Sequence, residues 1–175
     1  MADAPIAIVG GESLIGEDLR QRLAEELRGV KVKLVGTELE EGALITEQGG
    51  EPVLMTGLDE ETLHNSKVVI LTGSEEAGRK AYAMLTPSQV VIDLTGALED
   101  FPEARLRAPW IEAERGVVPS FCQVQVMAHP AAVALGKLLC RVAKGTRAVV
   151  TAMVPASEWE KPGITELHQI GRAHV

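Results

Sequence analysis

The order of apolar and polar positions near the N-terminus predicts a strand, a tight turn and a helix. Residues 6–9 form a short apolar run, and residues 10–16, Gly-Gly-Glu-Ser-Leu-Ile-Gly, form a turn with glycines at both ends. From Ile15 to Leu27, apolar residues recur every four positions with charged residues between them. That spacing is typical of an amphipathic helix, and Gly29 is expected to end it.

Further apolar runs along the chain predict a parallel sheet. Residues 30–35 are expected to form a second strand. Residues 68–71 and 90–94 are continuous apolar runs, as in parallel strands that are buried on both faces. Residues 122–127 are expected to form another strand. The chain between the second and third of these strands contains Gln48-Gly49-Gly50, which predicts a hairpin with short strands on either side.

The remaining segments are expected to supply helices, one irregular stretch and a late strand. Residues 75–85 and 131–143 read as helices because their apolar residues recur at helical spacing. Residues 102–119 show no clear period and are expected to be irregular, with Trp110 as their buried anchor. Residues 147–153 are expected to form a strand that has no visible partner in the chain.

Together these elements predict an α/β fold: a Rossmann-like, mostly parallel sheet with helices on both faces, followed by a truncated α+β domain. The expected boundaries are a dinucleotide-binding domain over residues 1–128 and the beginning of a second domain over residues 129–169. The last six residues, 170–175, match a translated sequencing adapter and are interpreted as an artefact.

The turn after the first strand is the candidate nucleotide site. Small residues there let the backbone pass close to a pyrophosphate, and the amides of the following helix face the phosphates. The alternative is a βα turn that needs glycine only for a positive φ. Glu38 follows Gly16 by about 20 residues, the separation expected for an acid that binds the adenosine ribose. The candidate cofactor-binding residues are Gly10, Gly11, Ser13, Leu14, Ile15, Gly16, Thr37, Glu38, Thr72 and Gly73.

Composition excludes several classes of function. The net charge of −8 and the aromatic content of 3% argue against nucleic acid, which needs a basic face and stacking platforms. No apolar run approaches the roughly 20 residues that cross a bilayer, and the N-terminus lacks the basic flank of a secretion signal, so a cytoplasmic protein is expected. Two cysteines, Cys122 and Cys140, are expected to be reduced and mostly buried, without a metal cluster.

Five short motifs occur in a fixed order between residues 6 and 169. They are the glycine turn at residues 10–16, Leu71-Thr72-Gly73, the Val-Ile-Asp run at residues 91–96, residues 129–134, and the pair of segments at residues 156–158 and 163–168. In this order they resemble the aspartate-semialdehyde dehydrogenase family. The resemblance implies a dinucleotide domain, the opening of a catalytic domain, reduction of aspartyl phosphate with NADPH through a cysteine thioester, and a homodimer when the protein is full length.

This chain departs from that family at the residues that carry the chemistry. Ala132 stands at the position of the nucleophilic cysteine, Val154 at a glutamine, Glu99 at or near an arginine, and Leu39 at the arginine that receives the adenosine 2′-phosphate. A methyl group forms no thioester. The chain is therefore most similar to cysteine-lacking relatives, and we predict no catalytic residue in it. His129 is read as a structural hydrogen bonder, with a general base as the alternative.

The sequence thus predicts a dinucleotide-binding pseudoenzyme of the aspartate-semialdehyde dehydrogenase type. The cofactor is expected to be NAD or NADP, with NAD favoured because Glu38 offers a carboxylate to the adenosine 2′ position and would repel a phosphate there. Two alternatives stay open. One is an active NADP-dependent semialdehyde dehydrogenase of amino-acid biosynthesis with displaced catalytic groups, and the other is a structural subunit that binds neither cofactor nor substrate.

Overall fold

The computed structural model describes residues 5–27, 29–37, 43–48, 51–142, 147, 149–153 and 155–173. Within these ranges, eight strands form one sheet in the order β3-β4-β2-β1-β5-β6-β8-β7. Among the described pairs, only β3 and β4 run antiparallel. The strands are β1 (Ile6–Val9), β2 (Val32–Gly36), β3 (Ala43–Gln48), β4 (Glu51–Gly57), β5 (Val68–Leu71), β6 (Val90–Asp93), β7 (Ala104–Arg107) and β8 (Val124–Met127).

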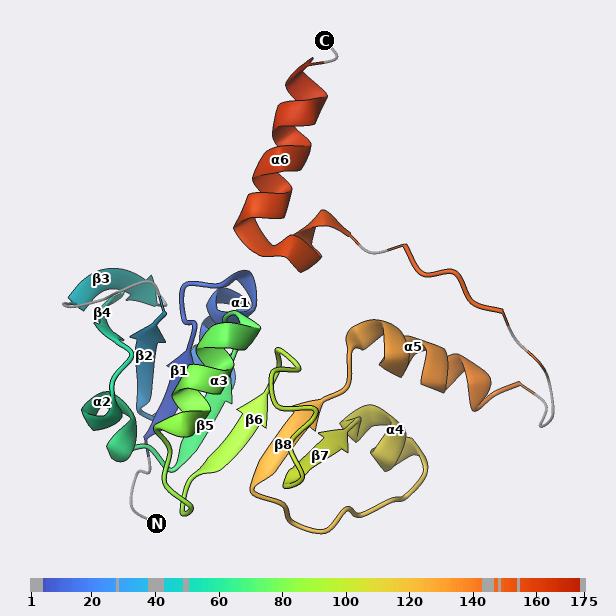
Figure 1. Cartoon of the computed structure of the whole chain (residues 1–175), viewed down its shortest axis with the longest axis horizontal. Helices are drawn as coiled ribbons and strands as arrows, with labels where there is room; N and C mark the ends of the chain where they lie inside the picture. Colours follow the sequence, from blue (N-terminus) through green and yellow to red (C-terminus); the bar gives the residue numbers. More distant parts are fainter. Residues whose placement is uncertain are drawn as a thin grey trace.

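Helices connect the strands and extend beyond the sheet (Figure 1). The segment after the last strand continues through α5 and an extended stretch to α6, which lies away from the sheet in Figure 1. No helix in the described ranges is both long and apolar enough to span a bilayer. The helices are α1 (Leu14–Glu26), α2 (Glu60–His64), α3 (Glu75–Ala83), α4 (Pro109–Glu114), α5 (Pro130–Leu139) and α6 (Glu160–Ala173), with a 3₁₀ turn, η1, at Ala156–Trp159.

Side chains along the central strands alternate between the two faces of the sheet, which divides the core into two layers. Ala7 and Val9 of β1 face a cluster that includes Leu63 of α2 and Ala81 of α3. Ile8 faces the opposite side, where the partly buried leucines of α1 pack. Because successive side chains of a strand point to opposite faces, helices cover the sheet on both faces. The predicted Rossmann-like, mostly parallel α/β fold is confirmed, and so is the antiparallel hairpin of β3 and β4.

The predicted apolar stripe of α1 is only half buried. Leu19 and Leu23 pack against the sheet, whereas Ile15 and Leu27 are each 44% exposed. The two exposed residues lie at the ends of a helix that contacts the sheet through its middle. Gly29 follows the helix with a φ of +88°, in agreement with the predicted stop.

The expectation of an irregular stretch at residues 102–119 was wrong. That stretch contains β7 and α4, and β7 was missed because its Ala-Arg-Leu-Arg sequence is only four residues long and half of it is charged. It is an edge strand with one neighbour, so it needs little apolar surface. Trp110 is not the anchor, because its side chain is 72% exposed and its ring lies under Lys137 at 5.3 Å. Ile111 points at Gly136 of α5 instead.

The expected strand at residues 147–153 is also absent from the described part of that segment. Residues 147 and 149–153 have no strand or helix, and Val149 and Met153 are more than nine-tenths exposed. A strand is stabilised by hydrogen bonds to a neighbouring strand, and no described strand lies beside this segment. High β propensity in the sequence was therefore insufficient.

A partly buried ion pair joins β7 to α4. The guanidinium of Arg107 donates through Nε at 3.0 Å and through Nη2 at 2.9 Å to the two carboxylate oxygens of Glu112. The Glu112 carboxylate also accepts from the amide of Ala108 at 2.9 Å. The hydrogen bonds from Arg107, followed by that from Ala108, hold the pKa of Glu112 below its ordinary value of 4.5.

Replacing Glu112 by Gln is expected to reduce the loss of stability that the protein shows as the pH falls. A depressed carboxylate pKa adds stability above pH 4.5, and this stability is lost as pH falls through the lower pKa of the folded state. Melting temperatures of the unaltered protein and of Glu112→Gln, measured from pH 7 to pH 3, should therefore converge toward low pH. Parallel curves would contradict the contribution of this pair.

Candidate functional site

The glycine turn between β1 and α1 is built by close backbone packing. Gly10 has a φ of +83°, and a Cβ at this position would collide with the backbone of Gly73 at the end of β5. A Cβ on Gly16 would collide with the carbonyl oxygen of Gly10. Positive φ and close approach both favour glycine. Packing within the fold is therefore sufficient to require these two glycines, and the positive φ that the alternative interpretation expects is found at Gly10.

Two hydroxyl groups hold this turn against β5. The Ser13 hydroxyl donates to the carbonyl of Thr72 at 2.7 Å and accepts from the amide of Gly16 at 3.0 Å, so it caps α1. The Thr72 hydroxyl is buried and lies 2.9 Å from the carbonyl oxygens of both Val9 and Gly10. The carboxyl ends of β1 and β5 are thus tied together, and the amino end of α1 is fixed beside them.

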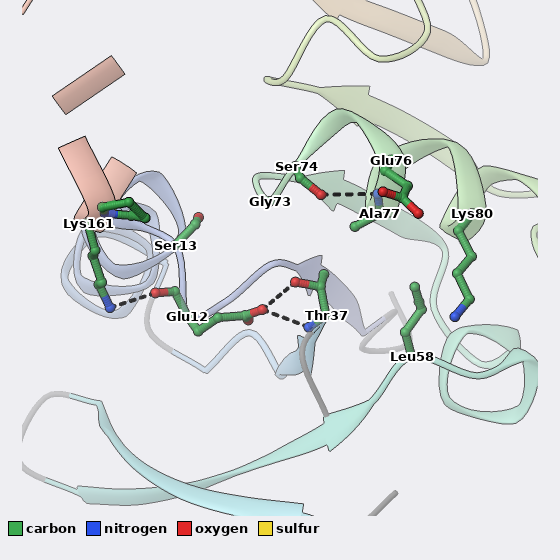
Figure 2. Close-up of a pocket in the computed structure, with 11 residues that line it drawn as sticks. Glu12, Ser13, Thr37, Leu58, Gly73, Ser74, Glu76, Ala77, Lys80 and Lys161 are labelled. Atoms are coloured by element: carbon green, nitrogen blue, oxygen red, sulfur yellow. Dashed lines mark hydrogen bonds between the residues drawn. The ribbon is translucent and has the colours of Figure 1, made fainter. Parts of the chain in front are cut away.

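A pocket of about 550 Å³ opens at this edge of the sheet (Figure 2). Its walls come from the ends of β1, β2 and β5, from the first turns of α3, and from α6. Its volume lies in the range of small-molecule sites. The lining residues are Glu12, Ser13, Thr37, Leu58, Gly73, Ser74, Glu76, Ala77, Lys80, Lys161 and Pro162.

Glu12 closes the pocket on the β2 side. Its Oε1 accepts from the amide of Thr37 at 2.7 Å and from the Thr37 hydroxyl at 2.5 Å (Figure 2). Its Oε2 is buried and has no hydrogen-bond partner among the described residues. A carboxylate thus covers both donors that Thr37 presents at the carboxyl end of β2.

Lys161 brings α6 onto the same turn. Its Nζ donates to the carbonyl of Glu12 at 2.8 Å and to the carboxylate of Glu17 in α1 at 2.6 Å. The ion pair is about half exposed, so its energetic contribution is small. Its structural effect is to place a cation from the end of the chain beside the amino end of α1.

The predicted site residues fall into four groups. Ser13, Thr37 and Gly73 line the pocket. Leu14 and Ile15 lie in the first turn of α1 and are not among the lining residues. Glu38 lies outside the described residues. Four others, buried behind the pocket wall, are Gly10, Gly11, Gly16 and Thr72.

Sequence reasoning missed several residues of the pocket. Ser74 follows Gly73 and accepts from the amide of Ala77, so a serine before Glu75 and Glu76 was a detectable helix-capping signal. Glu12 lies inside the glycine turn and lines the pocket, but it was not among the predicted site residues. Lys161 had no signal, because only the folded chain brings it to the turn.

Ala132, the position that the sequence motifs match to the family's nucleophile, lies at a second strand end. Ala132 is exposed in the first turn of α5, directly after β8. The Nδ1 atom of His129 accepts from the amide of Ala131 at 3.2 Å, so this histidine caps α5. Cys122 precedes β8. Cys140 caps the far end of α5, about 12 Å along the helix axis from Ala132.

The expectation of mostly buried cysteines was wrong for Cys140. This residue is exposed, and its Sγ lies 3.2 Å from Nη2 of Arg115. It follows the last residue of α5, and its neighbour there is the charged end of α4 instead of an apolar core. Cys122 is half-buried.

No family profile and no curated sequence matches the chain. Solved structures do match. A probable aspartate-semialdehyde dehydrogenase from Pseudomonas aeruginosa has a TM-score of 0.72 at 19% identity, over 95% of this chain and 51% of that one. Aspartate semialdehyde dehydrogenase II from Vibrio cholerae has a TM-score of 0.67 at 20% identity, over 94% and 50%. The enzyme from Candida albicans, solved with NADP, has a TM-score of 0.53 at 8% identity, over 80% and 48%.

The chain has the fold of aspartate-semialdehyde dehydrogenases. It spans about half the length of the dehydrogenases that it matches. The fold resemblance drawn from the sequence motifs is therefore confirmed, even though identity to each of these dehydrogenases is 20% or less.

Proposed function

We propose that this chain forms the dinucleotide-binding half of an aspartate-semialdehyde dehydrogenase-like protein that lacks thioester catalysis. The observation that carries the proposal is the pocket lined by Ser13, Thr37 and Gly73 at the carboxyl ends of β1, β2 and β5. In open parallel sheets, nucleotides bind at this edge, where the strand order reverses. Residues 1–128 would form the cofactor domain, and residues 129–169 would begin the second domain.

The residues of the pocket fit a dinucleotide. Gly73 lines the pocket without a side chain, so a ligand can approach its backbone. The capped amino end of α1 favours a phosphate, and Lys161 and Lys80 supply positive charge. Bound nicotinamide cofactor would supply hydride chemistry, while these residues bind and orient it.

The same geometry argues against thioester catalysis. The side chain of Ala132 at the start of α5 is a methyl group, which forms no covalent intermediate. Cys140 lies at the other end of that helix, and Cys122 lies before β8. We therefore propose a protein that binds NAD or NADP, with NAD favoured, without oxidising a semialdehyde. The full-length protein would be a homodimer, as the family resemblance implies.

Calorimetric titration of the chain with NADH tests the binding. Saturable binding is expected, and Lys161→Gln is expected to weaken it by about threefold, because an exposed cation contributes a fraction of a kcal/mol to binding an anion. The matched control is Lys67→Gln, which removes the same charge before the amino end of β5, at the opposite edge of the sheet. Its NADH affinity should equal that of the unaltered protein.

A phosphate-dependent assay of NAD or NADP reduction with aspartate semialdehyde tests the chemistry. No turnover above the protein-free blank is expected. Turnover would show that displaced groups carry the reaction, as in the active-enzyme alternative. Absence of binding to both cofactors would instead favour a structural subunit.

A further inference from the structure

We propose that Glu12 is the residue that sets the specificity of this pocket for the adenosine ribose, by admitting a free 2′-hydroxyl and rejecting a 2′-phosphate. The inference rests on the proposed dinucleotide binding, and it assigns the discrimination to a residue inside the glycine turn. The juxtaposition that carries it is a carboxylate from the end of β1 held on Thr37 at the end of β2.

The position of this carboxylate is the first step. In dinucleotide-binding folds, the residue that follows the second strand meets the adenosine ribose. In this chain, the donors at that point are the amide and hydroxyl of Thr37, and both are already bound to Glu12 Oε1. A 2′-phosphate arriving there would find no free donor on Thr37. It would find a negative charge instead.

The second oxygen of Glu12 is closed off from solvent. Oε2 is buried and has no hydrogen-bond partner among the described residues. A ligand therefore meets Glu12 as a negative charge and not as an exposed acceptor. A neutral ribose 2′-hydroxyl is compatible with this charge, whereas a 2′-phosphate is repelled by it.

The neighbouring cations do not cancel this effect. Lys161 donates to the main-chain carbonyl of Glu12 and to the carboxylate of Glu17, so the carboxylate of Glu12 is not its partner. Lys80 enters the pocket wall from α3, the element that follows β5. Among the described residues, the hydrogen bonds to the Glu12 carboxylate come from the amide and the hydroxyl of Thr37, which are neutral donors, so the carboxylate keeps its negative charge beside the ribose position.

The test is calorimetric titration of NAD and NADP at one ionic strength, with the unaltered chain and with Glu12→Gln. Glutamine keeps an oxygen for Thr37 and removes the charge. The unaltered protein is expected to bind NAD at least tenfold more tightly than NADP. The ratio of the NADP dissociation constant to the NAD dissociation constant should fall about tenfold in Glu12→Gln. For the unaltered protein, the same ratio should fall when both titrations are repeated at higher salt.

Two further variants locate the effect. Glu75→Gln removes an acid from the first turn of α3, outside the pocket lining, and should leave the ratio unchanged. Glu38→Gln tests the acid that the sequence pattern favoured. A change of ratio in Glu38→Gln and none in Glu12→Gln would overturn the assignment to Glu12.

The remaining outcomes separate this inference from the proposed function. The role of Glu12 is overturned if the unaltered protein binds NADP more tightly than NAD, or if Glu12→Gln has the same ratio of dissociation constants as the unaltered protein. Dinucleotide binding stands in both cases. Absence of binding of either cofactor to the unaltered protein overturns the proposed function, and the specificity assignment with it.

Discussion

Gly10→Ala is expected to destabilise the unliganded protein by about 2 to 5 kcal/mol. A residue with a side chain at a φ of +83° costs roughly 1–2 kcal/mol, and overpacking against the backbone of Gly73 adds about 1–3 kcal/mol. The backbone of Gly73 belongs to the end of the sheet and cannot move aside as a flexible side chain would. Urea unfolding of the unliganded protein measures the loss.

Gly29→Ala is the matched control for this substitution. Gly29 has a similar φ of +88°, but a Cβ there would meet nothing within 4 Å. It should therefore cost only the roughly 1–2 kcal/mol of backbone strain. Equal losses in the two variants would show that the approach of β1 to β5 is not what requires a glycine at residue 10.

Asp93→Asn is expected to destabilise the fold by about 2 to 4 kcal/mol. The carboxylate of Asp93 is fully buried at the end of β6. Its Oδ1 accepts from the amide and the hydroxyl of Thr95 at 2.8 and 2.6 Å, and its Oδ2 accepts from the amide of Leu98 at 2.9 Å. An asparagine must turn its amino group toward one of these donors and so leaves a buried donor unpaired.

Asp59→Asn controls for the change of charge. Asp59 is an exposed cap of α2, where it accepts from the amide of Thr62 at 2.6 Å. Asparagine caps a helix about as well as aspartate, so this variant should stay within about 0.5 kcal/mol of the unaltered protein. Urea midpoints for both variants provide the comparison. A loss at Asp93 no larger than that at Asp59 would contradict the role of the buried carboxylate.

The central strands were predictable because each is buried on both faces. The runs that became β1, β5 and β6 are continuous and apolar, a pattern that few other structures require. The edge strand β7 was not predicted, because its alternation spans only four residues, two of them arginines, and its Leu106 is exposed. Sequence therefore predicts the buried strands and the local hairpin of this sheet better than the short edge strand β7.

The candidate site was predictable only where it coincides with local backbone geometry. Gly10 and Gly16 carry a turn signature, because the chain must pass close to itself there. Lys161 reaches the same turn from α6, and the residue whose carbonyl it binds, Glu12, lies 149 positions earlier in the chain. Such a contact depends on the tertiary fold and leaves no local pattern.

At both margins of the sheet, the outermost strand comes earlier in the chain than the strand it pairs with. β3 precedes β4, and β7 precedes β8. The β3 strand pairs with β4 in a local hairpin, so its partner follows at once in the chain. The only hydrogen-bonded neighbour of β7 in the described sheet is the parallel strand β8, which follows only after α4. During synthesis, the edge of β6 therefore stays unpaired until residues 124–127 have left the ribosome, and β7 can join the sheet only after β8 has paired with β6.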